Sequence, residues 1–124
     1  MMQSRFLLAG LGLLTASSAA IANDLEGVWA RGDGKARVKV ERCGDNFCAT
    51  NIWVRPGTPL ERVGDQLVMD IDPVAPTRFE GRAKDVRRGM TYSMSITLGG
   101  ETMRTRGCVL GKLICKSADW ASVN

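Results

Sequence analysis

Apolar and polar side chains alternate between residues 91 and 120 in three segments, which Gly99-Gly100 and Gly111-Lys112 separate. Alternation with a period of two is typical of β-strands, because successive side chains point to opposite faces of the sheet. Glycine-containing pairs are favoured in two-residue hairpin loops. The pattern therefore predicts a meander of strands 91–98, 101–110 and 113–120 with one apolar face.

The two loops also determine which residues of the meander lie opposite each other. The predicted pairs are Tyr92 with Gly107, Met103 with Trp120, Arg104 with Asp119, and Cys108 with Cys115. A four-residue loop over 110–113 would keep the same facing and move the two cysteines to a closer backbone pair. A bulge at Gly107 would exchange the faces of everything after it.

A second hairpin is predicted from the alternation in 36–43 and 48–54, with residues 44–47 as its turn and Asp45-Asn46 at the tip. In this register Cys43 lies opposite Cys48 on the outer face, and Val38 lies opposite Trp53 inside. Ile52 and Val54 then fall on the outer face, which counts against the register.

Three further strands are predicted at 25–30, 66–71 and 78–84, the second of which ends at Asp72-Pro73. Residues 55–65 contain two prolines and two glycines, which predicts a loop that could serve as a lid or an edge crossing. About eight short strands without a helix favour an all-β fold, a sandwich or a closed antiparallel up-and-down barrel.

The first 22 residues have the features of a signal peptide. Arg5 provides the positive charge, Phe6 begins an apolar stretch, and Ala20-Ile21-Ala22 is a typical cleavage site. The apolar stretch is too short to span a bilayer, so we expect no stable membrane anchor. This predicts a periplasmic or secreted protein, cleaved after Ala22, with one β-barrel domain over residues 23–124.

Four cysteines in a short exported chain predict two disulfides, for which three connectivities are possible. The local pairing of Cys43 with Cys48 and of Cys108 with Cys115 is favoured, because each pair brackets a turn. The alternative is a zinc site made of four thiolates, but these spacings are wider than a typical zinc knuckle.

Charge and composition narrow the functional classes. The sequence has 17 Lys and Arg against 13 Asp and Glu, and the basic residues are scattered, so we expect no nucleic-acid partner. No histidine is present, which removes the commonest general base and metal ligand. Asp70 and Asp72 could ligate a cation but fit the end of a strand better. We therefore expect no enzyme, no cofactor and no metal.

The predicted registers define the interior of a barrel. Its apolar residues are Trp29, Val38, Val40, Trp53, Phe79, Tyr92, Met94, Ile96, Met103, Val109, Ile114 and Trp120, and its polar exceptions are Asn51, Thr105 and Lys116. An eight-stranded barrel can be filled by side chains or can hold one small ligand. The alternatives are thus a binding protein and a packed barrel that acts through its surface in the cell envelope. The sequence does not indicate the oligomeric state.

A small hydrophobic or amphipathic molecule is the candidate ligand. The candidate binding residues are Trp29, Asn51, Trp53, Tyr92, Met94, Thr105, Lys116 and Trp120. Lys116 inside the barrel would suit an acidic head group, whereas a lysine near the barrel mouth would extend to water instead.

The order of several short motifs resembles a family of exported bacterial proteins, domain of unknown function 2147. They are Gly27-Val-Trp29, Val38-x-Val40, Cys43, Cys48, Ile52-Trp53, Gly81, Gly89 before Tyr92, Arg106-Gly107-Cys108, Cys115 and Trp120. The resemblance covers essentially the whole mature chain and implies a lipocalin-like barrel in an exported compartment, without an established activity. An arginine commonly follows the closing tryptophan in such barrels, whereas Ala121 follows Trp120 here, so the resemblance implies no arginine contact to Trp29 from that position.

Overall fold

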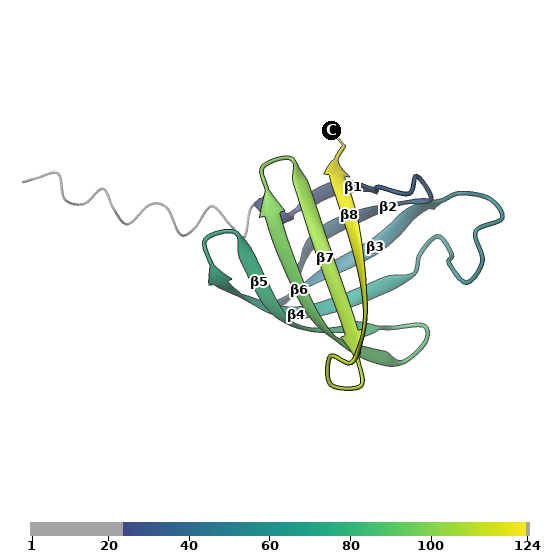
Figure 1. Cartoon of the computed structure of the whole chain (residues 1–124). Coiled ribbons are helices and arrows are strands. Elements are labelled where there is room, and N and C mark those ends of the chain that lie inside the picture. The colour runs from purple at the N-terminus through teal and green to yellow at the C-terminus, as the bar shows by residue number, and fades with distance from the viewer. Residues whose placement is uncertain (1–23, 124) are drawn as a thin grey trace, which may run out of the picture.

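The computed structural model describes residues 24–123, which form a single closed barrel (Figure 1). Its eight strands are β1 (Gly27–Arg31), β2 (Ala36–Cys43), β3 (Asn46–Val54), β4 (Gln66–Ala75), β5 (Arg78–Asp85), β6 (Met90–Gly99), β7 (Thr102–Val109) and β8 (Ile114–Ser122). The predicted all-β, antiparallel barrel is confirmed. The predicted signal peptide, residues 1–22, lies outside the described residues. Within residues 24–123, no helix is long and apolar enough to cross a membrane.

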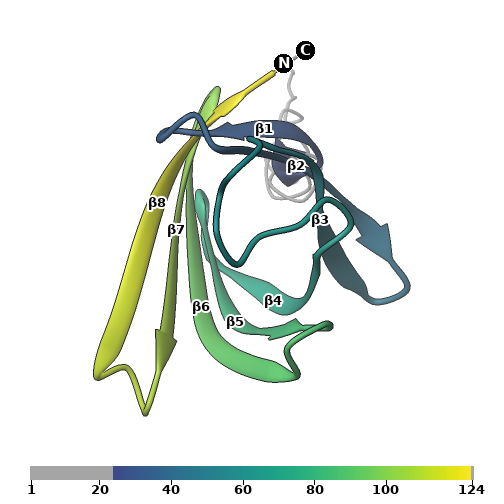
Figure 2. The same ribbon diagram turned by 90° about the vertical axis from the view of Figure 1, so that its right-hand side faces the viewer.

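Each strand pairs in antiparallel fashion with the next, and β1 closes the barrel against β8. This up-and-down order places the connections 32–35, 55–65, 86–89 and 110–113 at one end of the barrel, here called the mouth (Figure 2). The turns 44–45, 76–77 and 100–101 lie at the opposite, closed end.

The hydrophobic core fills the barrel toward the closed end. Phe47 and Phe79 meet edge to face there, with ring centroids 6.2 Å apart. Leu25 is fully buried, and its carbonyl accepts a hydrogen bond of 3.1 Å from the indole Nε1 of Trp29. The core residues are Leu25, Trp29, Val38, Val40, Phe47, Met69, Ile71, Phe79, Ala83, Ile96, Leu98 and Met103. Phe47 was predicted in a turn, and its position in the core is a correction.

The meander has the predicted facing but not every predicted pair. Between β7 and β8 the pairs Met103–Trp120, Arg104–Asp119 and Cys108–Cys115 are confirmed, with a four-residue loop over 110–113. Between β6 and β7 the prediction was wrong by two residues, because Gly100, not Gly99, takes the positive φ of the turn. A shift of two residues keeps every side chain on its predicted face. Gly107 therefore lies opposite Met94 instead of Tyr92.

The hairpin of β2 and β3 differs from its prediction in two ways. Its turn is Gly44-Asp45, which shifts the pairs by two residues and places Val38 opposite Asn51. A bulge between Arg37 and Val38 then reverses the facing at the end of β3. Trp53 consequently points outward, is 42 % exposed and lies under the guanidinium of Arg37, 5.9 Å from its ring centroid. The bulge also resolves the conflict at Val54, which becomes half-buried opposite Ala36, whereas Ile52 stays exposed.

Both predicted disulfides are confirmed. Cys108 and Cys115 are directly opposite, with Cα atoms 4.0 Å apart. Cys43 and Cys48 are diagonal neighbours on one face, with Cα atoms 5.8 Å apart. No cysteine remains free.

Strand β4 is longer than predicted and continues through Asp72-Pro73 to Ala75. Its pairing with β3 ends at Met69, so the rest of β4 has a strand partner only in β5. The backbone of Gln66 faces β5, because its carbonyl accepts a hydrogen bond from the N–H of Val86. Because backbone groups alternate along a strand, the nitrogen of Pro73 faces the side without a strand partner. The absence of an N–H on this proline therefore removes no hydrogen bond between strands.

Candidate functional site at the mouth of the barrel

The inner face of β6–β8 continues past the packed core toward the mouth. Tyr92, Met94 and Val109 are half-buried on this face, whereas Met90 and Ile114, nearest the rim, are 44 % and 59 % exposed. The inward side chains near the closed end are buried. Those near the mouth are partly exposed, so a second molecule can contact them.

Residues 55–65 cross the mouth as a strap between β3 and β4 (Figure 2). Backbone hydrogen bonds of 2.8 Å from the N–H of Asn51 to the carbonyl of Asp65, and from the N–H of Gly64 to the carbonyl of Asn51, fix one side of the strap. The Asn51 side chain adds a 3.3 Å bond from Nδ2 to the carbonyl of Arg62. Asn51, predicted as a ligand contact, is thus an anchor of the strap.

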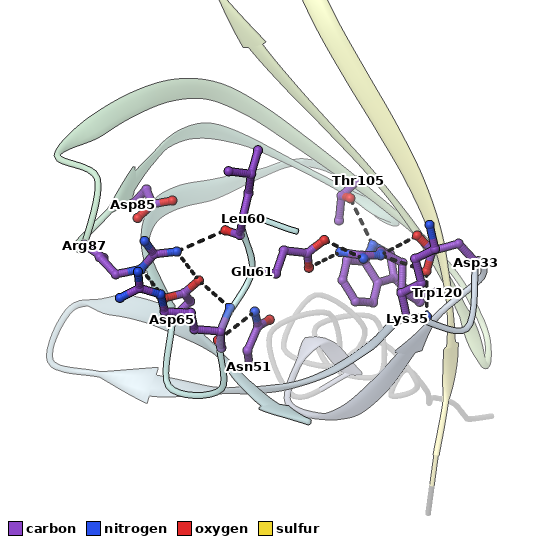
Figure 3. Close-up of polar contacts among 12 residues, drawn as sticks. Asp33, Lys35, Asn51, Leu60, Glu61, Asp65, Asp85, Arg87, Thr105 and Trp120 are labelled. Atoms are coloured by element: carbon purple, nitrogen blue, oxygen red, sulfur yellow. Dashed lines mark hydrogen bonds and ion pairs between the residues drawn. The ribbon is translucent and has the colours of Figure 1, made fainter. Parts of the chain in front are cut away.

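Two arginines from the β5–β6 turn hold the strap from the other side. Arg87 donates to both carboxylate oxygens of Asp65, at 2.6 and 2.8 Å, and to the carbonyl of Leu60 at 3.0 Å (Figure 3). Arg88 also donates to the Leu60 carbonyl and pairs with the buried Asp85 at 2.8 Å. The hydrogen bond from Arg87 lowers the pKa of Asp65 to about 2, so this carboxylate is charged well below neutral pH.

Arg31, at the end of β1, holds the centre of the strap. Its guanidinium makes two bonds of 2.9 Å to the carboxylate of Glu61, and its Nε donates to both carboxylate oxygens of Asp33 at 3.0 Å (Figure 3). It also lies 5.9 Å from the ring centroid of Trp120. The Trp120 indole N–H in turn donates to the Thr105 hydroxyl at 3.0 Å. The bond to Glu61 raises the pKa of Arg31, against the opposing effect of partial burial.

Arginines pair with the carboxylates at the mouth. Partial burial alone would raise the pKa of Asp33, but its bonds to Arg31 and to the N–H of Lys35 outweigh that effect and lower it. Glu61, Asp65 and Asp85 are likewise paired with arginines. A general acid or base needs a pKa near the working pH, which the environment of Asp65 opposes.

The structure brings five of the predicted site residues together. Tyr92, Met94, Thr105, Lys116 and Trp120 share the inner face of β6–β8. Lys116 lies opposite Gly107 and is exposed. This exposure agrees with the alternative in which a lysine near the mouth extends to water.

Two other predicted residues are elsewhere. Trp29 is buried in the core at 2 % exposure, and Trp53 is on the outside because of the bulge. Ile114 lies on the predicted inner face but is exposed, because this end of β8 extends beyond β1.

The residues that hold the strap escaped sequence reasoning. Arg31 lies just outside the predicted strand 25–30, although Gly27, Trp29 and Arg31 alternate and so share a face. That alternation was the available signal. Glu61, Arg87 and Arg88 carry none, because their contacts that hold the strap join residues 22 to 30 positions apart or go to a loop carbonyl.

Two open grooves are present on the described surface. One, of about 560 Å³, lies beside Gly32 and Asp119, and the other, of about 460 Å³, lies beside Asp70 and Lys84. Neither is an enclosed cavity, and neither is lined by Tyr92, Met94 or Lys116.

The fold and the site define a small, closed, eight-stranded antiparallel barrel with a packed closed end and a strapped mouth. A family model described as "Uncharacterized protein conserved in bacteria (DUF2147)" matches residues 27–122, and the chain belongs to this family. No curated protein and no solved structure matches the chain.

Proposed function

We propose that the chain is an exported, non-enzymatic binding protein that holds a small amphipathic ligand with an acidic group at its mouth. The observation that carries this proposal is the partly exposed inner face of β6–β8, where Lys116 shares a face with the half-buried Tyr92, Met94 and Val109. An apolar tail would cover Tyr92 and Met94, and its acidic group would meet the ammonium of Lys116.

Two further observations support this proposal. Both disulfides suit an oxidising compartment, as expected of an exported protein. The absence of histidine and the arginine-bound state of the mouth carboxylates favour binding over catalysis.

The direct test combines native mass spectrometry with a titration. Protein purified from its own compartment should carry a lipid-sized adduct, and calorimetric titration with decanoate should show saturable binding. Lys116→Met should weaken decanoate binding about tenfold, because one charge-assisted contact is lost. The control is Lys84→Met, an exposed lysine on β5 away from the inner face, which should leave the affinity unchanged. Equal affinities of Lys116→Met and the wild type would remove the anionic contact from the proposal, and no binding of either would refute it.

The second candidate function is a surface interaction module in the cell envelope. It is favoured by the distribution of exposed large apolar side chains, which gather around the mouth with the exception of Val74. They are Ile52, Trp53, Leu60, Val63, Val86, Met90, Leu110, Leu113 and Ile114.

A further inference from the structure

Strand β8 extends beyond the strand that closes the barrel against it. Its pairing with β1 ends where Trp120 meets Arg31. Toward the mouth, residues 114–118 pair with β7 on one side and have no strand on the other among residues 24–123. Figure 2 shows this part of β8 as the outermost strand.

Hydrogen bonding identifies the backbone groups on the open side. The carbonyl of Asp119 accepts a 2.7 Å bond from the N–H of Gly32, so its backbone faces the β1 side. Because backbone groups alternate along a strand, Ser117 and Cys115 face the same side. Their N–H and carbonyl groups have no backbone partner within the described chain. They can form a ladder with one more extended chain.

The side chains around this edge indicate the chemistry of such a chain. Leu113 is 82 % exposed and Ile114 is 59 % exposed, beside the exposed Lys112 and Lys116. Neither lysine takes part in an ion pair within residues 24–123, whereas Asp119 is already paired with Arg104 at 3.5 Å. The edge therefore offers apolar contacts together with uncompensated positive charge, which suits acidic and apolar side chains in alternation.

A second copy of the chain fits the same edge poorly. An antiparallel β8–β8 pairing that joins Cys115 to Ser117 of the other copy places the two Lys116 side chains directly opposite each other. Like charges in that position are destabilising. A different polypeptide of opposite charge avoids this repulsion.

We propose that the free edge of β8 binds an extended segment of a partner protein, which adds a strand through Cys115 and Ser117 and carries acidic and apolar residues in alternation. The strand addition gives the surface-module alternative a defined site. The proposed strand addition does not depend on ligand binding at the inner face, because removal of the Ser117 backbone N–H leaves the side chains of that face in place.

The test uses a peptide of about six alternating Glu and Val residues, the length of a typical strand. Ser117→Pro removes the free N–H and breaks no bond of the barrel, since that N–H faces the open side. Ser117→Ala keeps the N–H and is the matched control. Ser117→Pro should bind the peptide about tenfold more weakly, while Ser117→Ala should bind like the wild type. An amide NMR spectrum unchanged outside β8 would establish that Ser117→Pro is folded.

Charge is tested independently with Lys112→Glu, a change in the exposed loop. This variant should bind the Glu–Val peptide more weakly and a Lys–Val peptide more tightly. Equal binding by Ser117→Pro and Ser117→Ala would overturn the proposal. A wild-type dimer that Ser117→Pro dissociates would assign the edge to a second copy. Binding of anionic vesicles without peptide binding would assign it to a membrane, and either result would also overturn the proposal.

Discussion

At the closed end of the barrel, inward side chains from several strands pack on one another around Phe79, which is 1 % exposed. At the mouth, inward positions of the same barrel hold Arg31, Asp85 and Lys116. Apolar packing secures the first region, whereas arginine contacts secure the strap across the second. The difference shows that apolar packing and ionic contacts stabilise opposite ends of one short sheet.

Strand β4 has an unpaired edge toward the closed end and β8 has one at the mouth, and these two edges differ. The edge of β4 carries Pro73, whose nitrogen faces the open side, beside Asp72. Proline and charge are typical devices that prevent another strand from pairing. The edge of β8 has no proline and exposes Leu113 and Ile114 next to its free backbone groups. One edge is thus protected and the other is available.

The largest expected effect is a difference in unfolding free energy between side-chain truncations at the two ends. Phe79→Ala should lower the free energy of unfolding by about 3–5 kcal/mol, because it leaves a cavity in the closed core. Met90→Ala, at an exposed inward position of the mouth, should cost less than about 1 kcal/mol. Urea denaturation monitored by circular dichroism measures both. Similar costs for the two variants would contradict the division of roles between the ends.

A smaller effect is expected from the close approach of β4 and β5. A Cβ atom on Gly81 would lie 2.1 Å from the carbonyl oxygen of Asp70 and 2.8 Å from the Cα of Ile71. Because both neighbours are backbone, Gly81→Ala should destabilise the barrel by about 1–3 kcal/mol. The matched control is Gly107→Ala in β7, where a Cβ would meet nothing within 4 Å. This control should change the free energy of unfolding by less than about 0.5 kcal/mol, and a comparable loss at both glycines would refute the steric argument.

The smallest effect concerns the strap and depends on pH. The pKa of Asp65 falls from 3.8 to about 2 in the folded protein, so its ion pair with Arg87 stabilises the fold above about pH 4. This stabilisation is lost as the pH falls toward 2, because the carboxylate then takes up a proton in the folded state. Asp65→Asn should lower the Tm by a few degrees at neutral pH, and the difference from the wild type should vanish near pH 2.

Thermal unfolding across this pH range provides the measurement. Asp72→Asn is the control, because Asp72 is exposed and lies outside every ion pair within residues 24–123. If the Tm difference between Asp65→Asn and the wild type did not change with pH, the ion pair would not be what holds the strap.

Alternation along the chain predicted the eight strands, the facing of the meander and both disulfides, because these features depend on local sequence. Local turn chemistry was less decisive, since Gly99 and Gly100 are both suited to a turn and differ only in which one takes the positive φ. The bulge that turns Trp53 outward was not predictable from the alternation, although Ile52 and Val54 indicated a conflict. The strap contacts of Arg31 and Arg87 depend on the closed barrel, which brings distant segments together, and have no periodic signature.

The three tryptophans of the chain occupy three distinct environments, in the core at Trp29, on the outer surface at Trp53 and at the mouth at Trp120. Indole emission shifts to shorter wavelength as the ring is removed from water, so variants that retain one tryptophan each provide an optical signal for one region. Such variants would follow the closed end and the strap separately during unfolding, without an added label.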